Sequence, residues 1–238
     1  MFNKIMRFFE NGAICVICRR RCKDILFEYE GTGICSECHR MLSEEAACDY
    51  YDTQGVVKRL FAPFEYKDKI RKTLTDMKFN GFWSYAKPVG ELIADVLPDC
   101  YDFSVYDMII PVPLHEIRLK ERGYNQAELI AEPISERLDI ELANDVLFRI
   151  KNTKRQMTLS NALRQKNLHN AFYAVEEYVR GKRIILVDDI YTTGSTLKNC
   201  SKELLLKGAV EVSAIAVCEN FKRYDKPVFN IRIPVKDG

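Results

Sequence analysis

The sequence has no apolar run of the roughly 18 residues that a membrane-spanning helix needs. Its first residues, MFNKIMRFFENG, lack the apolar core of a secretory signal peptide. The formal net charge is only +2, so nothing global favours nucleic acid, and any electropositive surface must be local. Internal repeats and low-complexity tracts are also missing. We therefore expect a cytoplasmic protein without a transmembrane segment.

Two common phosphate-binding motifs are absent as well. The sequence has no G-x-x-x-x-G-K-[ST] and no G-x-G-x-x-G, which excludes a P-loop and the usual fingerprint of a dinucleotide-binding fold. What is present is a large apolar fraction, 47% of residues, enough for a sizeable core in one or two domains. After residue 50, predicted strands alternate with predicted helices. This order predicts a parallel sheet with crossover helices.

The nine cysteines are concentrated near the N-terminus. Cys15 and Cys18 form one C-x-x-C turn, and Cys35 and Cys38 form a second, with sixteen residues between the two turns. Each turn directs two thiolates at one point, and four thiolates complete the tetrahedron that structural zinc prefers. A closed site of this kind stabilises a fold and leaves no open position for catalysis. We therefore predict a small zinc-binding module over residues 1–50.

Other interpretations of the cysteines stay open. The four thiols can be free cysteines in a small core, and Cys22 or His39 can replace one member of the set. Because the N-terminus does not read as a secretory signal, reduced thiols are favoured over disulfides. The isolated thiols are expected to be core or incidental residues: Cys48, Cys100, Cys200 and Cys218.

The stretch GKRIILVDDIYTTGST places two acids after a buried apolar run. Residues 181–187 are predicted to form a strand that ends at Asp188 and Asp189, and a helix is predicted to begin near Ser195. In open parallel sheets, ligands bind beyond the carboxyl ends of the strands. The carboxylates suit sugar hydroxyls or Mg²⁺, while the hydroxyl-rich turn and the helix N-terminus suit a phosphate. The predicted phosphate-binding residues are Thr192, Thr193, Gly194, Ser195 and Thr196.

A purely structural role for this stretch is the alternative. The acid pair can cap a strand, and the Thr and Ser residues can cap a helix. An acidic pocket like that of response regulators is a further alternative, but such a pocket has no need of five residues with phosphate-binding composition.

A basic segment, PVPLHEIRLKERGYNQAELIA, follows another predicted strand. It holds three cations in five positions, Arg118, Lys120 and Arg122. Together they can neutralise a pyrophosphate, because Arg grips two oxygens at once. The alternative is an ordinary solvated basic loop. The helix predicted over residues 123–138 contains Pro133, which is expected to kink or shorten it.

These motifs resemble known families. IILVDDIYTTGST is similar to the signature of type I phosphoribosyltransferases, whose substrate is phosphoribosyl pyrophosphate (PRPP). The resemblance implies that Asp188 and Asp189 act at the catalytic centre, where they contact the ribose 2- and 3-hydroxyls, and that residues 192–196 hold the 5-phosphate. The chain also resembles ComF (ComFC/GntX-like) proteins from Cys15 to about Cys218. The motifs that follow one another as in that family are the cysteine knuckle (the two C-x-x-C turns), MKFNG, PVPLHEIRLKERGYNQAELIA, NTKRQMTLSNALRQKNLHNAF and this signature.

The ComF resemblance implies a fold, ligands and a biological process. The fold is α/β, a type I phosphoribosyltransferase-like parallel sheet with flanking helices over residues 51–238, preceded by the zinc module. The implied activity is Mg²⁺-dependent phosphoribosyl transfer from PRPP with release of pyrophosphate, linked to DNA uptake in competence. The alternative is a non-catalytic PRPP sensor that binds single-stranded DNA and partners such as a competence helicase or other DNA-uptake proteins. Beyond His115 no general base stands out, and no base-recognition hood is identified.

Residues 149–170 are basic and contain no acid. One interpretation is a mobile flap that closes over pyrophosphate, as type I phosphoribosyltransferases have. A second is a track for single-stranded DNA, and a third is a solvated helix face. A separate group belongs either to the core or to the wall of a site: Lys78, Phe79, Phe82 and Trp83.

The N-terminal FNKIMRFF places four apolar residues on one helical face: Phe2, Ile5, Met6 and Phe9. Such a face can lie on a membrane surface, which would place the protein peripherally at the inner membrane, or on a partner. Packing on its own domain, or fraying, is the alternative.

Overall fold

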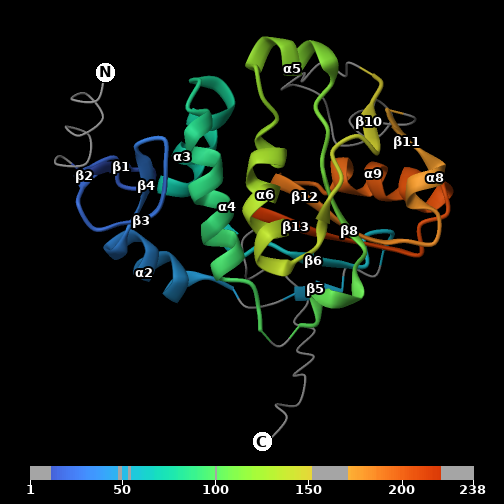
Figure 1. Cartoon of the computed structure of the whole chain (residues 1–238), viewed down its shortest axis with the longest axis horizontal. Coiled ribbons are helices and arrows are strands. Elements are labelled where there is room, and N and C mark those ends of the chain that lie inside the picture. The colour runs from blue at the N-terminus through green and yellow to red at the C-terminus, as the bar shows by residue number, and fades with distance from the viewer. Residues whose placement is uncertain (1–11, 48–49, 53–54, 100, 152–170, 221–238) are drawn as a thin grey trace, which may run out of the picture.

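The computed structural model describes residues 12–47, 50–52, 55–99, 101–151 and 171–220. Within these ranges the chain forms two main β-sheets with helices packed around them (Figure 1). Several predicted features lie outside the described residues: Phe2, Ile5, Met6, Phe9, Cys48, Cys100 and residues 152–170 of the basic segment. No helix in the described ranges is both long and apolar enough to cross a membrane. Attachment at the inner membrane stays a prediction.

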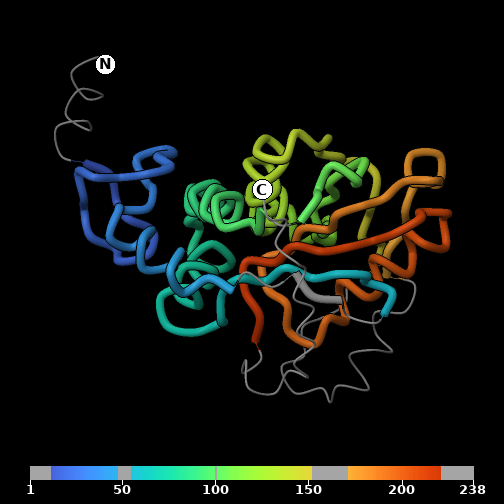
Figure 2. Tube along the Cα trace, turned by 90° about the horizontal axis from the view of Figure 1, so that it is seen from below, coloured from blue at the N-terminus to red at the C-terminus, as the bar shows by residue number. Residues whose placement is uncertain are grey.

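A four-stranded sheet and one helix form the cysteine-rich part, at one end of the molecule (blue in Figure 2). The strand order is β2-β1-β4-β3. The elements are β1 (Ala13–Cys15), β2 (Arg21–Cys22), β3 (Ile25–Tyr29), β4 (Thr32–Cys35) and α2 (Ser36–Glu45). Strands β1 and β4 are parallel neighbours, so they end at the same edge of the sheet. Because Cys15 and Cys35 are their last residues, the two C-x-x-C turns start side by side.

The second sheet is seven-stranded and follows the order β5-β6-β13-β12-β8-β9, with β7 also paired to β13. Its strands are β5 (Tyr50–Asp52), β6 (Arg59–Phe61), β7 (Phe64–Glu65), β8 (Met108–Pro111), β9 (Glu141–Leu142), β12 (Arg183–Tyr191) and β13 (Glu211–Glu219). All neighbours are parallel except β5 and β6. The central strands β12 and β13 are near-continuous apolar runs because both of their faces are covered. A separate antiparallel pair joins β10 (Leu147–Arg149) to β11 (Phe172–Ala174).

Helices cover both faces of this sheet, which confirms the predicted α/β fold with a parallel sheet and flanking helices. The helices after residue 50 are α3 (Asp68–Phe79), α4 (Ala86–Asp95), α5 (Glu116–Arg122), α6 (Gln126–Leu138), α8 (Glu176–Val179) and α9 (Ser195–Leu206), with short 3₁₀ turns η1 (Trp83–Tyr85) and η2 (Phe103–Val105). Of these, α5 buries no residue. Apolar residues of α4 and α6 pack on one face, and those of α9 pack on the other. The helix α9 buries Leu197, Cys200 and Leu204 along one stripe, as the sequence predicts.

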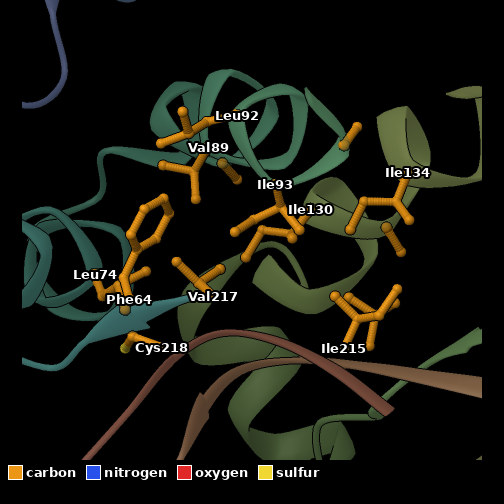
Figure 3. Close-up of a cluster of buried hydrophobic side chains, with 14 of the residues drawn as sticks. Phe64, Leu74, Val89, Leu92, Ile93, Ile130, Ile134, Ile215, Val217 and Cys218 are labelled. Atoms are coloured by element: carbon orange, nitrogen blue, oxygen red, sulfur yellow. The ribbon is translucent and has the colours of Figure 1, made fainter. Parts of the chain in front are cut away.

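The larger core lies between the α4–α6 pair and the sheet (Figure 3). Ile93 of α4 and Ile130 of α6 are almost fully buried there, and Val217 of β13 packs against the same cluster. Burying a side chain of this size stabilises the fold by about 1.5–3 kcal/mol. A glycine lets the two helices approach closely, because a Cβ on Gly90 would stand 2.5 Å from the Ile130 carbonyl oxygen.

The cysteine-rich part shares this core. Val16 and Ile34 are buried and belong to the cluster that also contains Leu74 of α3. The Thr73 hydroxyl, on α3, donates a 2.8 Å hydrogen bond to the Val16 carbonyl oxygen. The small sheet therefore packs on α3.

Two local predictions differ from the structure. Pro133 does not shorten its helix, since α6 continues to Leu138, while the kink named as the other outcome stays a prediction. The proline costs one backbone hydrogen bond, and its buried ring packs against the Gly90 position, where contacts with α4 offset the loss. The segment that carries Arg118, Lys120 and Arg122 forms a helix, α5, whereas the alternative prediction for it was an ordinary loop. It starts at the His115 N-cap, whose Nδ1 accepts a 3.2 Å hydrogen bond from the Ile117 N–H.

Candidate functional site

Asp188 and Asp189 lie in β12 at the point where a neighbouring strand stops. The pairing of β12 with β8 ends at Val187, whereas its pairing with β13 continues to Tyr191. The predicted strand end at residue 187 is therefore correct on the β8 side and wrong on the β13 side. The acids occupy an edge of β12 that the end of β8 leaves open, at the carboxyl end of the parallel sheet. This is the region where ligands bind in open α/β sheets.

The two acidic side chains leave β12 on opposite sides, but their carboxyl groups stay close enough to interact directly. Side chains alternate along a strand. Val187 packs in the cluster below α4 and α6, and Leu186 packs in the cluster below α9. Asp189 therefore faces the α3–α4–α6 side, and Asp188 faces the α9 side.

Asp189 forms a buried ion pair with a lysine from a distant helix. Lys78, in the last turn of α3, places Nζ 2.7 Å from Asp189 Oδ2, and the two side chains are only 9% and 5% exposed. Burial alone raises the pKa of Asp189, but the Lys78 ammonium outweighs it and holds that pKa below its ordinary value. Arg122 contributes in the same direction, so its guanidinium also lies near this carboxylate. Asp189 is thus a fixed negative charge.

Asp188 has a different electrostatic environment. Burial, together with the negative charge of Asp189 beside it, raises the pKa of Asp188 to about 8. Its Oδ1 accepts a 2.8 Å hydrogen bond from the Asp189 N–H. At neutral pH the ligand-free pair therefore carries one full negative charge. A divalent cation or an array of hydroxyl donors would favour the second ionisation.

The hydroxyl-rich turn leads from these acids into a helix N-terminus without a side-chain cap. Gly194 occupies the N-cap position of α9 with φ of 68°, in the left-handed region that favours glycine. A Cβ at this position would stand 2.7 Å from the Tyr191 ring. The Ser195 N–H donates a 3.4 Å hydrogen bond to Thr193 Oγ1, and the glycine N-cap leaves the next backbone N–H groups available to an anion.

The hydroxyls beside this helix start are oriented by each other. The Thr193 hydroxyl donates a 2.9 Å hydrogen bond to Ser195 Oγ. Thr192 and Thr193 are exposed, and Ser195 and Thr196 are half-buried. The five predicted residues thus form one continuous turn, with polar groups that solvent or a ligand can reach.

The three cations of α5 have different surroundings. Arg122 is half-buried, donates to Gln126 Oε1 and acts electrostatically on Asp189. Arg118 is half-buried. Lys120 is exposed and forms an ion pair with Glu116 one turn earlier. The structure therefore brings Arg122 to the acid pair and leaves Lys120 at the surface.

A second arginine, Arg149, acts electrostatically on a buried residue of α9. It is the last residue of β10 and forms a backbone bridge with His115. The charges of Arg149 and Asp188 both act on the buried thiol of Cys200. This arrangement gathers the ends of β8, β10 and β12. Residues 152–170, which continue from β10, lie outside the described residues.

The four predicted zinc ligands come together in the structure. The Sγ atoms of Cys15, Cys18, Cys35 and Cys38 all lie within 4.8 Å of one another. Zn–S bonds of about 2.3 Å in a tetrahedron place sulfurs about 3.8 Å apart, and the Cys18–Cys35 separation is 4.0 Å. The donor set therefore fits a closed tetrahedral zinc site.

The surroundings of this cluster favour a thiolate. Burial opposes ionisation of Cys18, but hydrogen bonds from the backbone and side chain of Arg20 lower its pKa to about 6. The two spare ligands do not join the group. His39 instead forms a 2.8 Å contact with Asp95, and Cys22 lies beside the cluster with its Sγ directed to the Arg20 carbonyl oxygen.

Two site features were not predicted from the sequence. The pairing of Lys78 with Asp189 has no local signal, because more than a hundred residues separate the two positions; MKFNG marks the segment but not its partner. The aromatics after Lys78 are also more exposed than core residues, with Phe79, Phe82 and Trp83 exposed by 59%, 44% and 40%. They belong to the surface of the molecule.

Comparison with known proteins assigns the family. Residues 125–235 match the model of the phosphoribosyl transferase domain. Competence protein ComFC of Bacillus subtilis is 30% identical over 220 residues, which cover 86% of this chain and 83% of that protein. The chain belongs to the ComF family. This result confirms the predicted ComF resemblance with its phosphoribosyltransferase domain.

Other relatives match a shorter part of this ComF-family chain. Competence protein F of Haemophilus influenzae is 44% identical over 108 residues, 44% of this chain and 47% of that protein. DNA utilization protein YhgH of Escherichia coli K12 is 38% identical over 112 residues, 47% of this chain and 49% of that protein. In these two matches the aligned part spans about half the length of the relative. A solved glutamine PRPP amidotransferase of B. subtilis covers 56% of this chain and 26% of its own, with 22% identity and a TM-score of 0.37.

Proposed function

We propose that this ComF-family chain binds PRPP with Mg²⁺ at the carboxyl end of β12 and transfers the phosphoribosyl group to a nucleophile. The observation that carries the proposal is the acid pair, with Asp189 fixed by Lys78, placed shortly before a helix N-terminus whose N-cap is a glycine. An acid pair suits the donors of a diol, and a helix N-terminus suits a phosphate. PRPP carries both groups on one ribose.

The remaining charge of PRPP is its pyrophosphate. With the diol at the acid pair and the 5-phosphate at residues 192–196, the pyrophosphate would face the side of β12 that the end of β8 leaves open. Arg122 lies near that position, and Arg118 is one turn earlier on α5. These guanidinium groups would stabilise the charge that develops on the leaving pyrophosphate.

The carboxylates fit Mg²⁺, which proteins usually bind through one or two carboxylates together with substrate phosphates. When bound, the ion would neutralise charge between ribose and pyrophosphate. Asp188 is the better placed of the two acids, since Lys78 already occupies Asp189 Oδ2. The protein itself orients the sugar, excludes water at the strand end and keeps Asp189 ionised.

The proposed reaction breaks the bond between C1 of ribose and the pyrophosphate oxygen, and forms a bond from C1 to the nucleophile. Pyrophosphate leaves with the bonding electron pair, and the nucleophile gives its proton to solvent or to a base. His115 lies at the start of α5, where its Nδ1 already accepts the Ile117 N–H. His115 is therefore a weak candidate for that base.

We also propose that zinc occupies the cysteine cluster. The four thiols belong to two C-x-x-C turns that the sheet order brings together, and no ligand position is left for substrate. The metal would hold β1, β4 and α2 in place. Its role is structural and separate from the reaction.

Pyrophosphate release from PRPP, measured with a panel of nucleobases and amines in the presence of Mg²⁺, tests the transferase proposal. We expect release with at least one acceptor and loss of release in Asp189→Asn. The exposed Glu177→Gln serves as a matched control. An active Asp189→Asn would contradict the assignment of the acid pair.

A second candidate function is supported by the surface beside the site. Phe79, Phe82 and Trp83 are exposed next to the last turn of α3, and α3 carries Lys69, Arg71 and Lys72. Exposed aromatics among cations are typical of single-strand binding surfaces. The names of two relatives, competence protein and DNA utilization protein, point to the same process. In this alternative the chain senses PRPP without turnover and binds single-stranded DNA and other DNA-uptake proteins.

Binding of a labelled oligonucleotide distinguishes the two functions. The alternative predicts tight PRPP binding, no pyrophosphate release with any acceptor, and DNA affinity that falls steeply with salt. Trp83→Ala should weaken DNA binding without changing PRPP affinity. DNA affinity that does not depend on salt would rule out the basic surface as the contact.

A further inference from the structure

The last two turns of α3 contact both functional regions of the chain. Asp76 accepts an ion pair from Arg19 of the cysteine knuckle, with Nη2 2.7 Å from Oδ2. Lys78, two residues later, forms the buried 2.7 Å ion pair with Asp189. Asp76 also accepts a 2.7 Å hydrogen bond from the Asn80 side chain. The C-terminal end of α3 is therefore fixed from the knuckle on one side and presents its lysine to the acid pair on the other.

Arg19 owes its position to the cysteine turn. It follows Cys18 directly, its φ of 67° is in the left-handed region, and its N–H donates a 2.8 Å hydrogen bond to the Cys15 carbonyl oxygen. A non-glycine residue keeps such a conformation only where its surroundings impose it. The turn that brings two thiols to one point is the turn that aims Arg19 at α3.

The junction between Arg19 and α3 is closely packed. Its guanidinium lies over the Tyr85 ring, 4.7 Å from the centroid, and Nη2 also approaches Thr73 Oγ1 at 3.4 Å. Thr73 in turn donates to the Val16 carbonyl oxygen. A planar guanidinium held by an acid, a hydroxyl and an aromatic face has one arrangement, so a displaced knuckle displaces the end of α3.

We propose that Arg19 is a positioning residue for the PRPP site. With metal bound at the four thiolates, Arg19 holds Asp76 and thereby keeps Lys78 against Asp189. Metal occupancy at the knuckle then sets the affinity of the acid pair for PRPP with Mg²⁺. This inference rests on the proposed PRPP and zinc sites and adds a coupling between them.

Coupling between two binding sites is reciprocal, and that gives a readout independent of activity. If bound zinc raises the affinity for PRPP, then bound PRPP must raise the affinity for zinc by the same factor. PRPP should therefore slow the loss of zinc. The experiment follows zinc transfer from the full-length, zinc-loaded chain to a chromogenic chelator, with and without PRPP and excess Mg²⁺. We expect PRPP to slow the transfer by about fivefold or more.

Three variants test the route of this coupling. Arg19→Ala and Asp76→Asn should retain bound zinc, bind PRPP about tenfold more weakly, and lose the effect of PRPP on zinc transfer. Arg19→Lys, which keeps the charge but not the planar fork, should restore part of the effect. Arg40→Ala is the matched control, because Arg40 pairs with Glu44 on the exposed face of α2 in the same part of the chain.

A PRPP-free comparison separates failure of the coupling from failure of the proposed function. Lys78→Met should speed zinc transfer in the parent chain but not in the Arg19→Ala background. If the parent chain binds no PRPP and this dependence on Arg19 is observed, the PRPP proposal fails. The coupling between the zinc cluster and Lys78 through Arg19 then still stands. Equal zinc-transfer rates in all backgrounds, or PRPP slowing zinc transfer equally in the parent chain and in Arg19→Ala, would overturn the coupling.

Discussion

The cysteine cluster and the acid pair are both short motifs at strand ends, but they are completed in opposite ways. The four thiols find their partners in one another, within a single small sheet. The acids depend on distant elements: Lys78 from α3 and Arg122 from α5. A closed ligand set can be recognised from its spacing, whereas a charged strand end acquires its properties from the fold around it.

In both sites, neighbouring groups of one residue type differ in pKa. In the cluster, hydrogen bonds to Arg20 outweigh burial at Cys18 and lower its pKa to about 6, while burial raises the pKa of Cys15 and of Cys38. In the acid pair, Lys78 lowers the pKa of Asp189, while burial and the neighbouring charge raise that of Asp188 to about 8. Two adjacent aspartates are therefore chemically distinct.

Removal of one zinc ligand should give the largest effect. In Cys35→Ser we expect loss of bound zinc and unfolding of the four-stranded sheet, because structural zinc supplies about 10–16 kcal/mol in small zinc-binding peptides. Metal analysis and hydrogen exchange over residues 12–45 measure both outcomes. Cys22→Ser is the control, since Cys22 lies beside the cluster but outside it. If Cys22→Ser lost zinc and Cys35→Ser did not, Cys22 would be a zinc ligand in place of Cys35.

Asp189→Asn should have the next largest effect, and on stability as well as binding. The change leaves the buried Lys78 ammonium without its counter-charge, which typically costs about 3–5 kcal/mol. PRPP affinity should fall by about a hundredfold or more. Denaturant unfolding and calorimetric titration measure the two quantities.

A double variant isolates the role of the ion pair. Lys78→Met combined with Asp189→Asn should regain part of the lost stability, because neither buried charge is then unpaired. Stability of Asp189→Asn equal to that of the parent chain would mean that the pair contributes nothing.

The pH dependence should be smaller and should come from Asp188. An unfolded Asp loses its proton near pH 3.9, whereas folded Asp188 keeps it to about pH 8. The folded state binds the extra proton between these values, so the stability of the ligand-free chain should fall as pH rises through this window. PRPP–Mg²⁺ affinity should instead rise towards about pH 8, by at most tenfold per unit, since the metal needs the carboxylate.

The variant Asp188→Asn should flatten both pH profiles. Unfolding free energies and dissociation constants at several pH values check the trend. An affinity that stays constant between about pH 6 and about pH 8 would show that Asp188 is ionised throughout.

The smallest effect is expected at Lys120. Its ammonium is exposed and paired with Glu116, so Lys120→Ala should change PRPP affinity by less than about twofold. Arg122→Ala should weaken binding by roughly tenfold to a hundredfold, as expected for a lost hydrogen bond to a charged group. Equal losses in the two variants would mean that α5 acts only through its overall charge.

Much of the fold and site follows from local sequence signals. The parallel sheet, the stripe of Leu197, Cys200 and Leu204 on α9, and the four-cysteine cluster are each visible as periodicity or spacing. The Lys78–Asp189 pair is not visible, because the partners meet only after α3 packs beside β12. The length of β12 was also underestimated, since its last residues depend on β13 alone.

The contact between Gly194 and the Tyr191 ring has an evolutionary consequence. A side chain at position 194 would force that ring to move, so we expect the two positions to vary together among homologues. Where a small residue replaces the tyrosine, an asparagine at 194 becomes admissible, because asparagine tolerates positive φ. Sequences that keep the large ring should be invariant in glycine three residues later.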